Sequence, residues 1–500
     1  MVLKPQIEDI KIIGFYSGKI IISLSLIMLL PVLCGFFFKE IQPVLDFTIS
    51  MGITYLFGLL LIRLCYTNKE LNWMQGMIVV SLSWLFAMFF GALPLFFSGH
   101  WNSYLDACFD AMSGFATTGL TLVQDLDHLS YTHNFWRHLT IFIGGQGIVI
   151  IALSVFTKGF IGAFRMYVGE ARDEKILPNL IYTARFIWLI SIVYLILGTL
   201  ILATIGIING LKAKNAFFHG ACLFMAAFDT GGFTPQSQSI LYYHSLPLEI
   251  VTMVIMILGA INFKLHYNVW ANRWRDILKD IETSIFLVTV AVTFFITALG
   301  LTQLSSYSNF TMLFRKGFYQ LISAHSGTGY QTIYAYQFNR EWGQLALTGI
   351  ILAMSLGGAV CSTTGAIKML RIGIIFNAIK EDLKRIMFPE RSFLIQKFYH
   401  LKDMVLEDKQ VRAASLITLS YIILFLLGTL VGVFYGYPFL DSLFESVSAS
   451  ANVGLSCGIT NTYMPWGLKL TYIVQMWTGR LEFMSVFTLI SFFLAVLKGK

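Results

Sequence analysis

Four glycines, each followed by an apolar residue, end four segments of similar composition in this chain of 500 residues. Each segment begins at a phenylalanine and continues with small and polar residues, as expected for a short helix with a small or polar face. The segments are Phe109–Leu120, Phe224–Phe233, Phe318–Tyr330 and Phe444–Leu455, and their glycines are Gly119, Gly232, Gly329 and Gly454. The shared pattern predicts four divergent copies of one structural element.

The chemistry that this element offers is that of the main chain. Glycine permits backbone angles that turn successive carbonyl groups toward one side. Rings of carbonyl oxygens can replace the water shell of potassium. The carboxyl end of each short helix carries about half a negative charge, so four such ends favour a cation. The pattern therefore predicts a passage for a dehydrated potassium ion, and it disfavours anions.

Glycines and small residues also have a purely structural use, because they let helices pack closely in lipid. For one segment alone this explanation would be the better one. Four copies, each lying between two apolar runs on the same predicted side of a membrane, favour the ion passage instead.

The elements that must position these segments are membrane-spanning helices. The chain is 56% hydrophobic and 12% charged, unlike soluble domains. Its apolar runs recur near the roughly 20 residues that a helix needs to cross the hydrocarbon core. About ten spans are predicted, at residues 20–38, 44–64, 74–97, 135–157, 186–209, 248–268, 284–304, 342–372, 413–434 and 466–496.

Basic residues predict the orientation of these spans. They gather in the connectors 158–185, 264–279 and 380–412 and near both ends of the chain. By the positive-inside rule, these connectors and both termini face the cytoplasm. The stretches between them, at residues 98–134, 210–247, 305–341 and 435–465, are too short for two crossings and are expected to dip into the outer side and return.

These features together predict the architecture. We expect an all-α integral membrane protein with four pseudo-symmetric repeats of helix, re-entrant loop and helix around one pore. An extra helix pair at residues 1–70 precedes the repeats. The repeats are expected at residues 71–165, 166–280, 281–405 and 406–500.

The second span of the third repeat is too long for one crossing. Its middle, Gly357 to Gly365, is rich in glycine, serine and threonine, so a helix is expected to break there. Such a break can place a flexible obstruction in the path of an ion, which makes it a candidate gate. A glycine kink without a function is the alternative.

The second span of the fourth repeat carries Arg480 and Glu482 inside an apolar run. A charge at the bilayer centre costs about 2.5 to 3.5 kcal/mol on insertion scales, so it should face protein or water. Residues two apart on a helix point to different sides, so the two are not expected to pair. We expect Arg480 to face the pore just below the carbonyl rings and to tune cation passage; an internal salt bridge is the alternative.

The chain resembles the TrkH, TrkG and KtrB superfamily of microbial potassium uptake proteins over nearly its whole length. It is most similar to the TrkH branch, because of the extra amino-terminal helix pair. The motifs that carry the resemblance are the four glycine segments, Gly144 to Gly147 (Gly-Gly-Gln-Gly), Asn262 to Tyr267, Gly357 to Gly365, and Gly479 to Glu482.

The resemblance implies roles for individual residues. The implied selectivity filter comprises Thr117, Thr118, Gly119, Thr230, Gly231, Gly232, Gly327, Thr328, Gly329, Asn452, Val453 and Gly454. The implied intramembrane gate comprises Gly357, Gly358, Ser362, Thr363, Thr364, Gly365 and Arg480.

The resemblance also implies partners and a location. It implies a homodimer in the cytoplasmic (inner) membrane, in contact with lipid, with one pore in each subunit. It further implies a cytoplasmic ring of nucleotide-binding, TrkA-like regulatory subunits. This chain carries no dinucleotide or P-loop fingerprint, so nucleotide sensing would belong to the partner. No cofactor is expected, and potassium is the transported ion.

Two residues beside the implied filter differ from a plain carbonyl lining. Asp229 could strengthen cation attraction or be neutralised by a neighbour. His325 could make the pore sensitive to pH, since histidine titrates near neutrality. The alternative is that its ring simply forms hydrogen bonds behind the filter.

Two other classes of function are weaker. A secondary transporter of an organic solute would show broken spans in two matching halves, whereas this chain shows a fourfold loop pattern. An enzyme is not expected, because the nine histidines form no HExxH or comparable ligand set.

The six cysteines are scattered, which indicates a role in packing. The net charge of +8 is explained by membrane topology, so no nucleic-acid partner is expected. Whether potassium would pass through a channel or a proton- or sodium-coupled symporter stays open.

Overall fold

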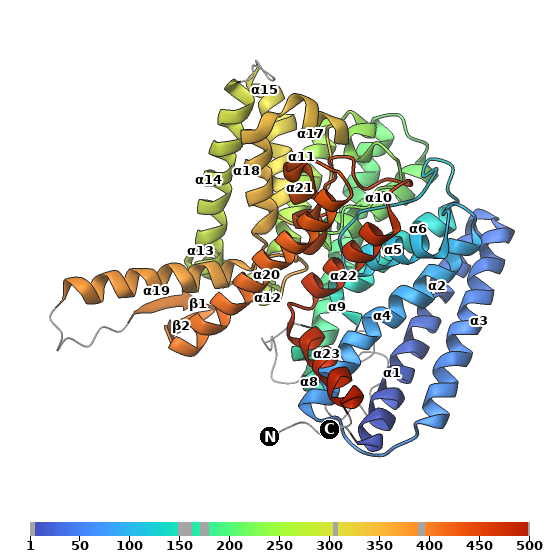
Figure 1. Ribbon diagram of the computed structural model, residues 1–500. Coiled ribbons are helices and arrows are strands. Elements are labelled where there is room, and N and C mark those ends of the chain that lie inside the picture. The colour runs from blue at the N-terminus through green and yellow to red at the C-terminus, as the bar shows by residue number, and fades with distance from the viewer. Residues whose placement is uncertain (1–5, 149–162, 171–179, 304–308, 389–395, 499–500) are drawn as a thin grey trace.

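The computed structural model of this chain describes residues 6–148, 163–170, 180–303, 309–388 and 396–498. These residues are mostly helical, as predicted (Figure 1). A small antiparallel hairpin departs from the all-α expectation and consists of β1 (Lys397–His400) and β2 (Lys402–Val405). It lies beside α19, and the two project from the side of the helical bundle (Figure 1).

The helices follow the predicted order of an amino-terminal unit and four repeats. The amino-terminal unit contains α1 (Ile7–Ile27), α2 (Leu29–Phe38) and α3 (Ile41–Leu64). The first repeat contains α4 (Trp73–Phe97), α5 (Tyr104–Phe115), α6 (Tyr131–Gln146) and α8 (Ala163–Gly169). The second contains α9 (Leu180–Ile208), α10 (Ala213–Phe228), η1 (Ser239–Tyr243), α11 (Leu246–Ala260), α12 (Phe263–Trp270) and α13 (Arg275–Lys279).

The third repeat contains α14 (Ile281–Gln303), α15 (Phe310–Met312), the π-helical turn η2 (Leu313–Phe318), α16 (Tyr319–His325), α17 (Ala335–Glu341), α18 (Gly343–Ser355) and α19 (Met369–Met387). The fourth contains α20 (Asp408–Phe434), α21 (Phe439–Ser450), α22 (Trp466–Arg480) and α23 (Met484–Leu497). In every repeat a long helix is followed by a short one: α5, α10, α16 and α21.

Six of the described helical stretches are long and apolar enough to cross a membrane, and two sharply bent helix pairs bring the number to as many as eight. The first stretch is α1 with α2, Ile7–Phe38, which begins well before the predicted start at residue 20. Charged residues such as Lys11 and Lys19 interrupt the apolar run in the sequence without ending the helix. The final part of the predicted span 135–157 lies outside the described residues.

Two predicted spans, 248–268 and 466–496, are wrong as continuous helices. The pair α11 and α12 bends by 103°, and the pair α22 and α23 bends by 116°. At the first bend the Asn262 side chain accepts a hydrogen bond from the Lys264 amide and so starts a new helix. At the second bend Glu482 and Phe483 have φ of 50° and 74°, which a continuing right-handed helix excludes.

The break predicted within 342–372 is present. Helix α18 ends at Ser355, and α19 begins only at Met369. The intervening chain returns upon itself, with a parallel bridge between Leu356 and Ile367. The two ends of this turn approach closely because residue 357 is a glycine. A Cβ atom at Gly357 would lie 2.2 Å from the Gly365 carbonyl oxygen.

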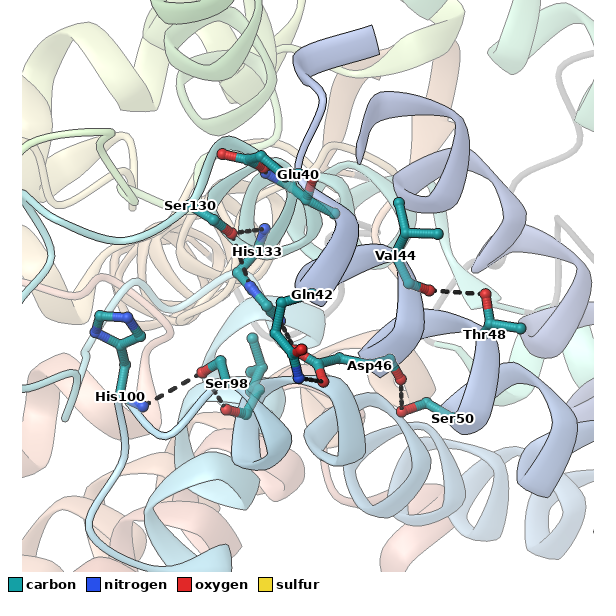
Figure 2. A network of polar contacts seen from close by, with 12 residues as sticks. Glu40, Gln42, Val44, Asp46, Thr48, Ser50, Ser98, His100, Ser130 and His133 are labelled. Atoms are coloured by element: carbon teal, nitrogen blue, oxygen red, sulfur yellow. Dashed lines mark hydrogen bonds and ion pairs between the residues drawn. The ribbon is translucent and has the colours of Figure 1, made fainter. Parts of the chain in front are cut away.

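The amino-terminal unit docks on the first repeat through polar contacts that are partly or fully buried (Figure 2). The Glu40 carboxylate accepts hydrogen bonds from the amides of Tyr131 (3.0 Å) and Thr132 (2.9 Å), the first residues of α6. A carboxylate at this helix end also complements the helix dipole. Nearby, His133 and Asp46 approach to 3.5 Å. The unit thus holds the start of α6 in place.

Candidate ion pathway

The four short helices α5, α10, α16 and α21 end in the same backbone conformation. The three residues that follow each end are here called the axial segments: 117–119, 230–232, 327–329 and 452–454. Their first residues have left-handed φ angles: Thr117 at 53°, Thr230 at 50°, Gly327 at 73° and Asn452 at 56°. Their last residues, all glycines, are also left-handed: Gly119 at 92°, Gly232 at 64°, Gly329 at 84° and Gly454 at 88°.

A common hydrogen bond fixes this conformation. In each repeat the amide of the middle axial residue donates to the carbonyl five residues earlier: Thr118 to Ser113 (2.8 Å), Gly231 to Ala226 (2.8 Å), Thr328 to Ser323 (2.9 Å) and Val453 to Ser448 (2.9 Å). This is the bond of a helix-ending Schellman motif. A left-handed residue other than glycine costs about 1 to 2 kcal/mol, and Thr117, Thr230 and Asn452 all carry that cost.

The axial segments touch one another in a closed cycle. A Cβ atom at each axial glycine would meet the middle carbonyl oxygen of the next segment: Gly119 meets Gly231 at 2.4 Å, Gly232 meets Thr328 at 2.1 Å, Gly329 meets Val453 at 2.0 Å, and Gly454 meets Thr118 at 1.9 Å. The four segments therefore surround one axis in the order of the repeats. Any side chain at these glycines would displace a carbonyl group of the neighbouring segment.

Three of the four repeats brace their axial segment from behind with a second glycine. A Cβ atom at Gly144 would lie 1.7 Å from the Phe115 carbonyl oxygen. Gly259 stands in the same relation to Phe228 at 2.0 Å, and Gly479 to Ser450 at 1.9 Å. Each glycine belongs to the helix that follows the axial segment and packs against the carbonyl two residues before that segment. This contact explains why glycines occur at Gly144 and Gly479 in two of the sequence motifs.

A polar cavity of about 250 Å³ opens at one end of the axis. All four axial glycines line it, together with hydroxyl-bearing residues such as Thr121 and Ser456. Arg137 also lines it and is buried, with its guanidinium 3.5 Å from the Asp110 carboxylate and 3.2 Å from the Thr121 hydroxyl. The cavity is large enough for several water molecules.

Polar side chains behind three axial segments hold the chain that leaves the axis. The Leu122 amide donates to Asp110 (2.6 Å), the Thr332 amide to Gln320 (2.8 Å), and the Cys457 amide to Glu445 (3.0 Å). In each case the acceptor lies seven residues before the first axial residue, and the donor lies five residues after it. These bonds were not predicted from the sequence, although Asp110 and Glu445 stand as carboxylates inside the glycine segments.

The broken stretch of the third repeat meets the axis at the end opposite the cavity. The Thr363 hydroxyl lies 2.9 Å from the carbonyl oxygens of both Phe228 and Gly259, and 3.3 Å from the Thr230 hydroxyl. A Cβ atom at Gly365 would lie 2.4 Å from the Ala451 carbonyl oxygen. The loop 357–365 therefore contacts the second and fourth repeats just before their axial segments.

Hydrogen bonds within the loop 357–365 stabilise its folded shape. The Gly358 amide donates to the Thr364 hydroxyl at 3.0 Å, and the Ser362 and Thr364 hydroxyls are 2.9 Å apart. Lys368, which is buried, donates to both the carbonyl and the hydroxyl of Thr364. This role of Lys368 was not predicted, although Lys368 is the first charged residue after the long uncharged run that starts at Trp342.

Arg480 joins the loop to the axis. Its guanidinium donates to the Thr363 carbonyl (2.6 Å), the Thr117 hydroxyl (3.2 Å) and the Gly144 carbonyl (2.6 Å). Glu482 forms an ion pair with Arg371 of α19. The two fourth-repeat charges thus make different contacts, in keeping with the expectation that they point to different sides.

Asp229 and His325 come just before their axial segments in the chain and do not line the cavity described above. The Gln146 amide group donates to the Asp229 carboxylate at 2.8 Å. His325 is buried with its Nε2 atom 2.8 Å from the Thr289 hydroxyl and its ring edge-on to Phe286. The position of the His325 ring behind the segment favours the hydrogen-bonding alternative over a role in pH sensing.

Comparisons with known proteins agree with this geometry. The family model of the TrkH cation transport proteins matches residues 45–495. The chain is 30% identical to an uncharacterized cation transporter of Methanocaldococcus jannaschii, over 96% of this chain and 95% of that protein. It is 26% identical to the Trk system potassium uptake protein TrkG of Escherichia coli, over 97% and 99% of the two chains.

The fold is also found in a solved structure. The crystal structure of the potassium transporter TrkH from Vibrio parahaemolyticus matches with a TM-score of 0.80 at 23% sequence identity, covering 97% of this chain and 99% of that chain. The arrangement of spanning helices described above is that of a multi-pass membrane protein. On the extent of the family match, the chain belongs to the TrkH family of cation transport proteins.

Proposed function

We propose that this protein takes up potassium across the cytoplasmic membrane, and that the four axial segments are its selectivity filter. The single observation that carries the proposal is the closed cycle in which each axial glycine packs against a middle carbonyl of the next segment. Such packing fixes the spacing of the carbonyl groups around the axis. Carbonyl groups at fixed spacing can replace the hydration shell of one cation better than that of another.

The proposed filter residues follow from position. They are Thr117, Thr118, Gly119, Thr230, Gly231, Gly232, Gly327, Thr328, Gly329, Asn452, Val453 and Gly454. Potassium is the proposed cargo, because the names of the relatives TrkG and TrkH describe potassium uptake. In this proposal the chain is a transporter and not an enzyme, and it needs no cofactor.

The proposed gate is the loop 357–365 together with Arg480. The loop lies against the second and fourth repeats, and Arg480 adds a fixed positive charge within 3.2 Å of the Thr117 hydroxyl. A positive charge at this point opposes the passage of a cation by Coulomb repulsion. Movement of the loop would remove the Thr363 carbonyl, which is one of the groups that hold Arg480, and would so change the surroundings of the charge.

The remaining parts of the proposal concern orientation, assembly and boundaries. Both termini would be cytoplasmic, with the cavity of about 250 Å³ facing outward. The chain would act as a homodimer with a nucleotide-binding, TrkA-like subunit on its cytoplasmic side, because its relatives are components of Trk systems. The proposed units are the helix pair 1–70 and the repeats 71–165, 166–280, 281–405 and 406–500.

The test of this function is ion flux through the purified protein in liposomes with imposed gradients. We expect potassium-dependent uptake that sodium competes with weakly and that small organic solutes do not affect. Uptake of an organic solute with indifference to potassium would overturn the proposal. Reversal potentials measured with and without a proton or sodium gradient would separate a channel from a coupled symporter.

The gate is tested by Arg480→Ala. We expect a severalfold higher potassium flux, since the substitution removes both the repelling charge and the hydrogen bond to the Thr363 carbonyl. Arg385→Ala is the matched control, because Arg385 is an exposed arginine of α19 that pairs with Glu381. Equal flux in the wild-type protein and in the Arg480 variant would remove Arg480 from the proposed gate.

A further inference from the structure

A cluster of three metal-binding side chains lies apart from the axis. Asp280 precedes α14, Glu282 lies in its first turn, and His400 ends strand β1. All three are buried, with exposed fractions of 0%, 2% and 4%. In the part of the chain that the structure describes, this is the one group of three such residues whose ligand atoms all lie within 4.8 Å of one another.

The spacing of the three ligand atoms suits a small ion. The Nδ1 atom of His400 is 3.3 Å from the Asp280 carboxylate and 3.9 Å from the Glu282 carboxylate. Ligand atoms on a tetrahedral zinc ion, with bonds of about 2.0 to 2.2 Å, stand about 3.3 to 3.6 Å apart. Both distances from the imidazole lie close to this range, and the two carboxylates offer oxygens within 4.8 Å of each other.

Main-chain groups already orient the two carboxylates. Asp280 accepts hydrogen bonds from the amides of Glu282 (2.9 Å) and Leu401 (2.9 Å). One oxygen of Glu282 accepts from the Val360 amide at 2.7 Å, and its other oxygen is the one that faces His400. Hydrogen bonds that fix ligands from outside are typical of metal sites, where they contribute strongly to affinity.

We propose that Asp280, Glu282 and His400 form a binding site for a divalent transition metal of the zinc class. One imidazole with two carboxylates is a donor set that zinc accepts, whereas magnesium and calcium prefer oxygen ligands alone. Two carboxylates also balance the charge of a divalent ion when the imidazole is neutral.

The site would join two parts of the molecule. His400 belongs to the β-hairpin beside α19, and Glu282 holds Val360 within the loop 357–365. A bound ion would therefore fix the hairpin to the loop that we propose as the gate. Only this mechanical consequence rests on the proposed function; metal binding itself does not.

The experiment is a titration of the full-length protein in detergent with cobalt(II), a coloured substitute for zinc, after treatment with a chelator. We expect one cobalt ion per chain, with the strong visible absorption of a four- or five-coordinate ion, and its displacement by zinc. Absence of this one-equivalent binding in the wild-type protein would overturn the proposal, whatever the variants do.

Variants then locate the site. His400→Gln should weaken cobalt binding at least tenfold, and Glu282→Gln should do the same while it keeps an oxygen for the Val360 amide. The matched control is His128→Gln, because His128 forms an exposed pair with Asp125 at 2.8 Å. Equal loss in the control and in the His400 variant would contradict the proposed location.

A variant that gains a new absorption band distinguishes loss of a metal ligand from misfolding. His400→Cys, checked for the elution volume of the wild-type protein, should bind cobalt with an added thiolate-to-cobalt charge-transfer band. The six native cysteines are present in both proteins, so the band would come from position 400. Cobalt bound by this variant without that band would show that residue 400 is not a ligand.

Discussion

In the first, third and fourth repeats, the chain leaving the axial segment is held by a polar side chain of the same repeat, whereas the second repeat relies on other repeats. The acceptors Asp110, Gln320 and Glu445 have no counterpart in the second repeat, where the equivalent residue is Leu223. The equivalent donor is absent as well, because the position is Pro235, which has no amide hydrogen. Acceptor and donor are therefore missing together, and no polar group is left unsatisfied by this difference.

Contacts from neighbouring repeats replace the missing bond. The Tyr330 hydroxyl of the third repeat donates to the Leu223 carbonyl at 2.8 Å, and Asn134 of the first repeat donates to the Pro235 carbonyl at 3.0 Å. Asp127 of the first repeat also accepts from the Ser237 amide at 2.8 Å. The comparison teaches that one pseudo-symmetric element can be kept in place either by its own helix or by its neighbours.

The largest expected effect comes from removing an acceptor that belongs to the same repeat as the axial segment it holds. Glu445→Leu would leave buried donors without a partner, among them the amides of Cys457 (3.0 Å) and Ile459 (3.2 Å). Each such group costs about 1 to 3 kcal/mol, so we expect a loss of at least about 3 kcal/mol, visible in thermal unfolding in detergent, and loss of potassium flux.

Two controls sharpen this test. Glu445→Gln keeps an acceptor oxygen and should lose less stability. Leu223→Met makes a similar change of size at the equivalent apolar position and should cost less than about 1.5 kcal/mol. If Glu445→Leu lowered the free energy of unfolding by no more than Leu223→Met does, the polar acceptors of the other three repeats would not contribute to stability as we propose.

The next effect in size concerns the axial glycines, which should behave alike in both kinds of repeat. Gly119→Ser and Gly232→Ser each push a side chain against a neighbouring carbonyl. We expect the preference for potassium over sodium to fall about tenfold, which corresponds to about 1.4 kcal/mol. Flux assays with both ions measure this.

Gly52→Ser is the control for the glycine variants, because no atom lies within 4 Å of the added Cβ position. Its ion preference should equal that of the wild-type protein. Unchanged preference in both axial variants would count against the filter.

A smaller effect tests the dependence of the second segment on the third repeat. Tyr330→Phe removes one hydrogen bond to the Leu223 carbonyl and should cost about 1 kcal/mol in unfolding. Its effect on ion preference should be non-additive with Gly232→Ser, because both changes act on the second segment.

A comparison with a glycine variant in the fourth axial segment makes the Tyr330 test specific to the second segment. In the closed cycle Gly119 packs against the second segment, whereas Gly454 packs against the first, so Tyr330→Phe is paired with Gly454→Ser, which does not touch the second segment. That pair should be closer to additive. Tyr463→Phe, at an exposed tyrosine, should change nothing. Full additivity of Tyr330→Phe with Gly232→Ser would contradict the proposed dependence of the second axial segment on the third repeat.

The smallest effect is expected from Asn134→Ala. It removes the hydrogen bond to the Pro235 carbonyl, whose net worth is about 0.5 to 1.5 kcal/mol. The potassium preference should fall by less than in Tyr330→Phe, because Asp127 still holds the same stretch of chain through the Ser237 amide. A larger fall than in Tyr330→Phe would reverse the order of importance that we assign to the two neighbours.

The repeated glycine segments could be predicted from the sequence because their requirements are local. Each needs a short helix, a left-handed turn and a glycine, and these leave a mark within a dozen residues. Arg480 was also predictable as a residue facing the axis, since a charge in an apolar span must find polar surroundings. Its partners, the Thr363 and Gly144 carbonyls, lie far away in the chain and left no local mark.

The parts that could not be predicted depend on contacts between distant segments. The breaks at Asn262 and at Glu482 follow from a side-chain cap and from left-handed residues inside runs that are otherwise apolar and continuous. The substitution of neighbours for Asp110, Gln320 and Glu445 in the second repeat requires the positions of Tyr330 and Asn134. Sequence periodicity contains no information about such positions.

The central claim is that main-chain oxygens of the four axial segments bind a dehydrated ion on a shared axis. It is tested most directly by diffraction from crystals soaked in rubidium or thallium, with anomalous scattering used to locate the ion. We expect an anomalous peak on the axis between the carbonyl groups of Thr118, Gly231, Thr328 and Val453. Anomalous peaks elsewhere in the protein, with none on that axis, would contradict the account.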